Sequence, residues 1–226
     1  MITKRMISLP LLLPAILYSC FISTTAYAQQ VTDSVTPEIA GQNQEAALVH
    51  AKKNMVVTAH PLATNAGFDV LKHGGSAIDA MVAVQTVLGL VEPQSSGLGG
   101  GAFLVYYDAA SNTVKTFDGR ETAPLNATPE LFQDNQGNPL KFYDAVVGGR
   151  SVGTPGTVKL LYDAHQRFGS QPWASLLQPA ISLATDGFTV TPRLAEAIAA
   201  DAQRLQRYAA TAHYFFDQKG SPLPAG

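Results

Sequence analysis

The chain has 226 residues, a net charge of −2 and a charged fraction of only 14%. No cluster of Lys and Arg forms the basic patch that a nucleic-acid-binding protein needs, so we expect no nucleic-acid partner. The five histidines and the single cysteine form no metal-ligand motif, so we expect no metal site.

The first 28 residues have the layout of an export signal. Lys4 and Arg5 precede an apolar run over 6–22, and Ala-Tyr-Ala at 26–28 fits a cleavage site. A membrane anchor is the alternative. The run, however, contains two prolines, is short for a span of about 20 residues, and is followed by no basic cluster. We therefore expect cleavage after residue 28, no membrane anchor, and a periplasmic or secreted protein.

Lipid attachment at Cys20 is a further alternative, but Tyr18 is bulky for a lipoprotein cleavage site. If cleavage follows residue 28, the mature chain contains no cysteine and depends on its core rather than on disulfides. The polar segment 29–49 is expected to be a loose leader. The ordered domain is then expected to span 50–226.

The first part of this domain predicts one strand and two helices. The apolar run 55–59 is typical of a strand, and a helix is expected from Pro61 to about His73, where two glycines end it. Ser76 and Asp79 form a capping-box pattern for a second helix. This helix, over 77–91, is apolar almost all round and therefore belongs in a core, with Asp79 and Gln85 as its main polar interruptions.

The rest of the domain adds a hairpin and more helices. Two strand-like runs joined by a turn of five residues predict a β-hairpin. Mixed strands and helices predict a layered α/β or α+β fold. The expected strands are 102–107 and 113–117, and the expected helices are 154–168, 173–184 and 192–208.

A glycine-rich loop lies between the second helix and the hairpin. Residues 97–102 fit G-x-G-x-x-A, but a dinucleotide site needs a strand before the motif and a helix after it, and here the order is reversed. We expect a tight turn with unusual backbone angles, combined with close approach of another segment or a ligand. Ser95 and Ser96 flank the glycines, yet no G-x-S-x-G motif and no base accompany them, so serine-hydrolase chemistry is not indicated.

Arg120 follows the second hairpin strand directly. Its planar guanidinium can bind a carboxylate through two hydrogen bonds. The alternative is an ordinary turn arginine paired with Glu121 or another acid, and the residues alone favour that reading.

Four long blocks of this sequence occur in a specific order, and together they resemble the large subunit of γ-glutamyltranspeptidase, also called glutathione hydrolase. They are MVVTAHPLAT, GFDVLKHGGSAIDAMVAVQTVLGLVEPQSSGLGGGAF, FDGRETAP and RSVGTPGTVKLLYDAHQRFG. The resemblance extends from about residue 50 to the end. One departure is Ala102, where many members continue the glycine run.

The resemblance implies the N-terminal-nucleophile hydrolase fold, an αββα sandwich. It also implies a precursor that cuts itself into a large and a small subunit, which stay together as a heterodimer. The cut exposes a threonine that takes the γ-glutamyl group from glutathione or a related compound. Water, an amino acid or a peptide then accepts the group, and no cofactor is involved. An N-terminal amine suits this chemistry because it can act as a base near neutral pH.

The resemblance assigns one site residue to this chain. The arginine of the family's D-G-R-E block binds the α-carboxylate of the donor, and here it is Arg120. Glu121 is expected to help hold that arginine or to assist maturation. Thr58 and Thr211 both precede an alanine and a histidine, but neither lies in the family's cleavage block. The catalytic threonine is therefore expected beyond residue 226, and a chain ending within the large subunit is expected to hold an incomplete fold and to be inactive alone.

Two other functions remain open at this point. One is an exported acylase of the same fold that acts on β-lactam side chains, and the other is an exported binding protein that lost catalysis. Substrate choice separates the first from a γ-glutamyl enzyme, and a cleavable threonine block separates the second.

Overall fold

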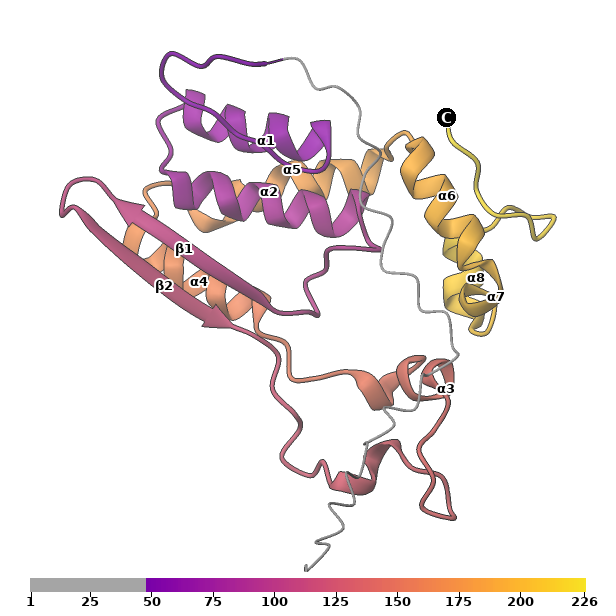
Figure 1. The fold of residues 1–226 in the computed structure, drawn as a ribbon. Coiled ribbons are helices and arrows are strands. Elements are labelled where there is room, and N and C mark those ends of the chain that lie inside the picture. Colours follow the sequence, from indigo (N-terminus) through magenta and orange to yellow (C-terminus); the bar gives the residue numbers. More distant parts are fainter. Residues whose placement is uncertain (1–47) are drawn as a thin grey trace, which may run out of the picture. The chain divides into compact units, whose positions relative to one another are not determined.

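The computed structural model describes residues 48–226, which belong to one compact unit. The expected export signal and almost all of the expected leader lie outside the described residues. Figure 1 shows the arrangement of the elements. In chain order they are α1 (Pro61–Lys72), α2 (Ala77–Val91), β1 (Ala102–Asp108), β2 (Thr113–Gly119), the 3₁₀ turn η1 (Pro129–Phe132), α3 (Phe142–Val146), the 3₁₀ turn η2 (Gly149–Ser151), α4 (Thr157–Phe168), α5 (Trp173–Asp186), α6 (Pro192–Ala200), α7 (Ala202–Leu205) and α8 (Ala209–Phe215).

Helix α2 lies at the centre of the packing, as its apolar sequence predicts. It contacts α1, α4 and α5, and Val82, Val87 and Val91 are fully buried. Small residues on α1 let the two helices approach closely: a Cβ added to Gly67 would lie 2.5 Å from Val84 Cγ2. Each fully buried valine contributes about 1.5–3 kcal/mol relative to an exposed one, so α2 supplies much of the core.

The starts of α1 and α2 follow the expected capping chemistry. Pro61 is the first residue of α1, and Nδ1 of His60 accepts a hydrogen bond from the backbone N–H of Leu62. At α2, the backbone N–H of Ser76 donates to Asp79 Oδ2, and the backbone N–H of Asp79 donates to Ser76 Oγ. The predicted capping box is therefore confirmed.

Strands β1 and β2 form the expected antiparallel hairpin, with Ala102 opposite Gly119 and Asp108 opposite Thr113. Its inner face packs on α4, and Leu104 and Phe117 contact the cluster that holds Leu160 of α4. The outer face of β1 exposes three large apolar or aromatic side chains, those of Phe103, Val105 and Tyr107. The connection is one residue shorter than expected because Asp108 pairs in the strand.

Three expectations about secondary structure are wrong in detail. Residues 55–59 form no strand and have no strand partner among residues 48–226, and a strand needs a neighbour for its backbone hydrogen bonds. The helix expected over 154–168 begins only at Thr157, because Thr154 bridges to Thr122 instead. The helix expected over 192–208 ends at Ala200.

That last helix breaks at Asp201, which caps α6 with non-helical backbone angles. The chain then forms the short α7 and, after Tyr208, the unexpected α8. The carboxylate of Asp201 pairs with the guanidinium of Arg204 three residues later.

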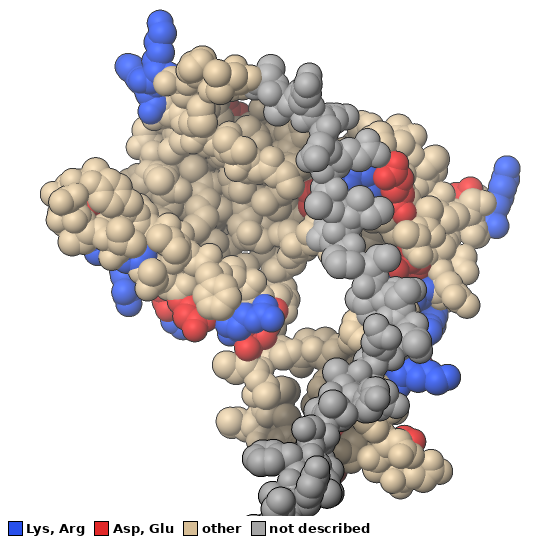
Figure 2. Space-filling view, in the orientation of Figure 1, with Lys and Arg blue, Asp and Glu red and all other residues tan. Residues whose placement is uncertain are grey.

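Charged side chains are sparse on the face shown in Figure 2. Oppositely charged atoms lie side by side near the hairpin, and much of the surface over the helices is uncharged. Within the described residues, no helix combines the length and the apolar character needed to cross a membrane.

Candidate functional site

Three segments that are distant in sequence meet beside the hairpin. They are the glycine loop 97–101, the end of β2 with residues 120–122, and the approach to α4 at 153–157. The carbonyl oxygen of Gly100 accepts hydrogen bonds from the backbone N–H groups of Gly156 (3.0 Å) and Thr157 (3.1 Å). The glycine loop therefore satisfies two of the amide groups that the start of α4 leaves free.

Arg120 lies where these segments converge. Its backbone N–H donates to Asp118 Oδ1 at 2.9 Å, which fixes the turn after β2. Its Nη1 atom lies 2.8 Å from Oε2 of Glu121, while 65% of the arginine side chain stays exposed. The predicted neighbour pair thus forms. Because an exposed ion pair is worth only about 0–1 kcal/mol, the guanidinium stays available to another carboxylate.

Glu121 is enclosed by glycines on two sides. A Cβ added to Gly101 would lie 2.4 Å from Glu121 Oε2, and one added to Gly153 would lie 2.8 Å from Glu121 Cβ. Any side chain at these two positions would push Glu121 away. Its Oε2 atom is buried and makes an ion pair with Arg120 rather than a well-aligned hydrogen bond.

The two expectations for the glycine loop have different outcomes. Close approach of another chain segment is confirmed by Gly101, which packs against Glu121. Unusual backbone angles are not found, because none of the glycines from 97 to 101 has a positive φ. At Gly101 the loop needs glycine for space rather than for left-handed conformation.

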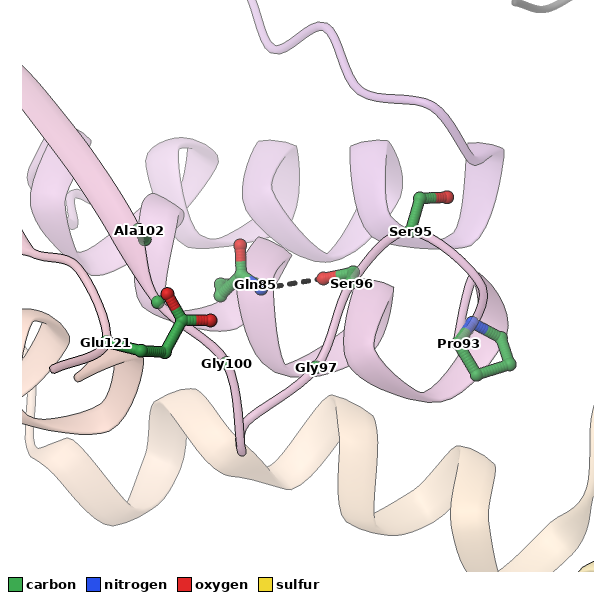
Figure 3. A pocket seen from close by; sticks show the side chains of 9 residues that line it. Gln85, Pro93, Ser95, Ser96, Gly97, Gly100, Ala102 and Glu121 are labelled. Atoms are coloured by element: carbon green, nitrogen blue, oxygen red, sulfur yellow. Dashed lines mark hydrogen bonds between the residues drawn. The ribbon is translucent and has the colours of Figure 1, made fainter. Parts of the chain in front are cut away.

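Figure 3 shows the pocket beside this loop. Gln85 of α2, Ser95, Ser96 and Glu121 supply its polar lining, together with loop backbone. Gln85 Nε2 donates to Ser96 Oγ at 2.7 Å. The sequence alone identifies Gln85 only as a polar interruption of an apolar helix and predicts no role for it. The pattern that could have indicated a role is a lone side-chain amide on a core helix just before a glycine-rich loop.

Asp79 is a fully buried acid, and it joins α2 to the α4–α5 connection. Its carboxylate accepts hydrogen bonds from the N–H and hydroxyl of Ser170 and from the N–H of Gln171. Burial alone would raise the pKa of Asp79, but the hydrogen bonds from Ser170 and Ser76 outweigh it and lower that pKa. We assign this acid to stability.

The remaining sequence candidates lie elsewhere. Thr211 lies within α8, and the Thr58 hydroxyl donates to the carbonyl of His60 at 2.8 Å. Neither residue lines the pocket beside the glycine loop. Arg120 is not one of its lining residues either, although its neighbour Glu121 is. Among residues 48–226, no group of three or more His, Cys, Asp or Glu side chains comes together as a metal site.

Comparison with known proteins identifies the relatives of these segments. Residues 63–226 match the family model described as gamma-glutamyltranspeptidase. A glutathione hydrolase proenzyme of Bacillus subtilis strain 168 is 45% identical over 175 residues, which are 77% of this chain and 30% of the relative. The matched part of the chain spans between 21% and 31% of the length of such curated relatives.

Solved structures extend the likeness to three dimensions. Helicobacter pylori gamma-glutamyltranspeptidase aligns with a TM-score of 0.75 and 34% identity, over 79% of this chain and 51% of that one. A cephalosporin acylase from Bacillus halodurans aligns less closely, with a TM-score of 0.62 and 28% identity, over 81% of this chain and 36% of that one. The expected fold class, part of a layered N-terminal-nucleophile hydrolase, is confirmed by the first of these likenesses.

Proposed function

This chain belongs to the γ-glutamyltranspeptidase family, and we propose on that premise that it is the donor-binding part of a γ-glutamyl transferase and hydrolase. The observation that supports this proposal is Arg120. Its guanidinium is mostly exposed, is held from one side by Glu121, and lies at the junction of three segments. An exposed, oriented fork of this kind fits the α-carboxylate of a γ-glutamyl compound such as glutathione.

The proposed reaction has two acyl-transfer steps. A threonine at the start of the partner small subunit attacks the γ-carbonyl, and its own α-amine takes the hydroxyl proton. The leaving amine departs, and water, an amino acid or a peptide then takes the γ-glutamyl group from the threonine. Arg120 contributes by binding the donor's carboxylate, which places the γ-carbonyl at a fixed distance from the nucleophile.

Export and assembly are also part of the proposal. The basic and apolar layout of residues 1–28 supports cleavage of a signal and a periplasmic or secreted location. The exposed apolar outer face of β1 supports a further layer contributed by the small subunit, because contiguous exposed apolar surface often marks an interaction site. Mass measurement of the mature subunits would test cleavage of the signal and self-cleavage.

The acylase remains as a second candidate, since the chain resembles one solved cephalosporin acylase. The family model and the higher TM-score of the Helicobacter pylori structure favour the γ-glutamyl enzyme. The two differ in substrate: one binds a free α-carboxylate at Arg120 and the other acts on the side chain of a β-lactam.

One assay separates these candidates. The complete gene product is incubated with a γ-glutamyl anilide, with and without a dipeptide acceptor, and chromophore release is followed. Release that rises with acceptor is expected. Release that is indifferent to acceptor would indicate a hydrolase, and no release from folded, self-cleaved protein would contradict the proposal.

A further inference from the structure

Gln85 is an unusual residue on α2, because most of this helix is apolar and packs in the core. Its amide group instead turns toward the pocket and donates a 2.7 Å hydrogen bond to the hydroxyl of Ser96 (Figure 3). A partly buried hydrogen bond of this kind restrains both side chains. The bond joins the core helix directly to the segment that leads into the glycine loop.

The glycine loop needs such a restraint. Its first end is held by the backbone N–H of Ser96, which donates to the carbonyl of Glu92, and its last end by the carbonyl of Gly100, which accepts from α4. Between these ends, a Cβ added to Gly97 or Gly99 would meet nothing within 4 Å. Glycine backbones lose much conformational freedom when ordered, so a loop this rich in glycine depends on each contact that restrains it.

The position of the loop determines the position of Glu121. Gly101 touches the Glu121 carboxyl group so closely that even a methyl group would clash with it. Glu121 in turn holds Nη1 of Arg120 at 2.8 Å. A shift of the loop would therefore move the Arg120 guanidinium through two contacts, Gly101 with Glu121 and Glu121 with Arg120.

From these contacts we infer that Gln85 is a positioning residue, which holds the glycine loop through Ser96 and thereby orients Arg120 toward the carboxylate of the donor. This inference rests on the proposed function, since it concerns the same donor site. We expect Gln85 to act through Ser96 and the loop rather than by contact with the donor. Its effect is on donor affinity rather than on the acyl-transfer steps, because those steps take place at the threonine of the small subunit.

The test uses the complete, self-cleaved enzyme and a γ-glutamyl anilide as donor. Gln85→Ala is expected to raise the donor KM about three- to ten-fold and to change kcat less than about two-fold, because a binding contact is misaligned while the chemistry is untouched. In an Arg120→Lys background the same substitution is expected to have little further effect, since residues that act through one another are not additive.

The matched control is Thr86→Ala, the next residue on α2, whose hydroxyl bonds only to backbone carbonyls of the same helix. It is expected to leave the KM of the donor unchanged. If Gln85→Ala does not fold, the same contact is tested from its other side by comparing Ser96→Ala with Ser96→Thr, because threonine keeps the hydroxyl. The donor KM is expected to rise in Ser96→Ala and to stay near the wild-type value in Ser96→Thr.

Two results would overturn the inference while leaving the proposed function intact. One is an active wild type whose donor KM does not change in Gln85→Ala. The other is an equal effect of Gln85→Ala with and without Arg120, which would indicate general destabilisation. An inactive wild type would instead overturn the proposed function.

Discussion

Ser170 donates both its backbone N–H and its hydroxyl to the carboxylate of Asp79, which lies 91 residues earlier in the chain on α2. The Asp79 side chain is completely buried and also accepts from the N–H of Ser76. One carboxylate thus caps its own helix and holds the loop between α4 and α5 against it. Asp79 therefore links two separate parts of the fold, a role that its position in an apolar helix does not indicate.

Replacing Asp79 with alanine is expected to lower the free energy of unfolding by about 2–4 kcal/mol, because buried donors lose their acceptor. Thermal unfolding of the complete protein at pH 7 would measure this loss. The folded-state pKa of Asp79 is lowered, so its contribution is present above the unfolded value near 3.8 and is lost as pH falls through the folded pKa. The difference between variant and wild type should therefore shrink below about pH 4. A difference that stays constant down to pH 2 would contradict this assignment.

His60 should make stability depend on pH in a higher range. Burial lowers the pKa of its imidazole, although the carboxylate of Glu92 opposes that shift. The folded state favours the neutral ring, so stability is full above the unfolded pKa of 6.5 and declines as pH falls through that value toward the folded pKa. His60→Asn keeps a capping side chain but removes the titration, and is expected to flatten the melting temperature between about pH 5 and 7.

The exposed His50 offers the control for this effect, and His50→Asn should leave the pH dependence as in the wild type. A wild-type melting temperature that does not fall between pH 7 and 5 would count against a buried neutral His60.

Arg120→Lys tests the proposed donor contact. Lysine keeps the charge but loses the planar fork, so the donor KM is expected to rise about ten-fold or more, while the enzyme still cleaves itself. Steady-state kinetics with a γ-glutamyl anilide measures this. Arg150→Lys, at an exposed position in η2, is the control and should leave KM unchanged. An unchanged KM in Arg120→Lys would remove the residue from the site.

Gly101→Ala tests the packing of the glycine loop on Glu121. The added methyl group would lie 2.4 Å from the carboxylate oxygen, so Glu121 must move and its contact with Arg120 is lost. Overpacking of this kind costs about 1–3 kcal/mol, and kcat/KM for the donor is expected to fall at least ten-fold. Gly99→Ala is the matched control, because its Cβ would meet nothing within 4 Å. Equal activity of the two variants would show that the close approach does not matter.

The amino-acid sequence by itself determined the elements whose signals are local. The capping box at Ser76, the proline at the start of α1 and the largely apolar run of α2 each act within a few residues, so they predict the helices well. The hairpin follows in the same way from two apolar runs and a turn. The family resemblance, carried by long ordered blocks, led to Arg120.

Only the tertiary structure decided which distant residues meet. The space around Glu121 is set by Gly101 and Gly153, which lie on different segments, and nothing in either local pattern indicates that contact. The bond of Gln85 to Ser96 spans a helix end, and that of Asp79 to Ser170 spans 91 residues. The strand expected over 55–59 failed for the same reason. An apolar run of this kind favours a strand, but a strand forms only where packing brings a second strand alongside to complete its backbone hydrogen bonds.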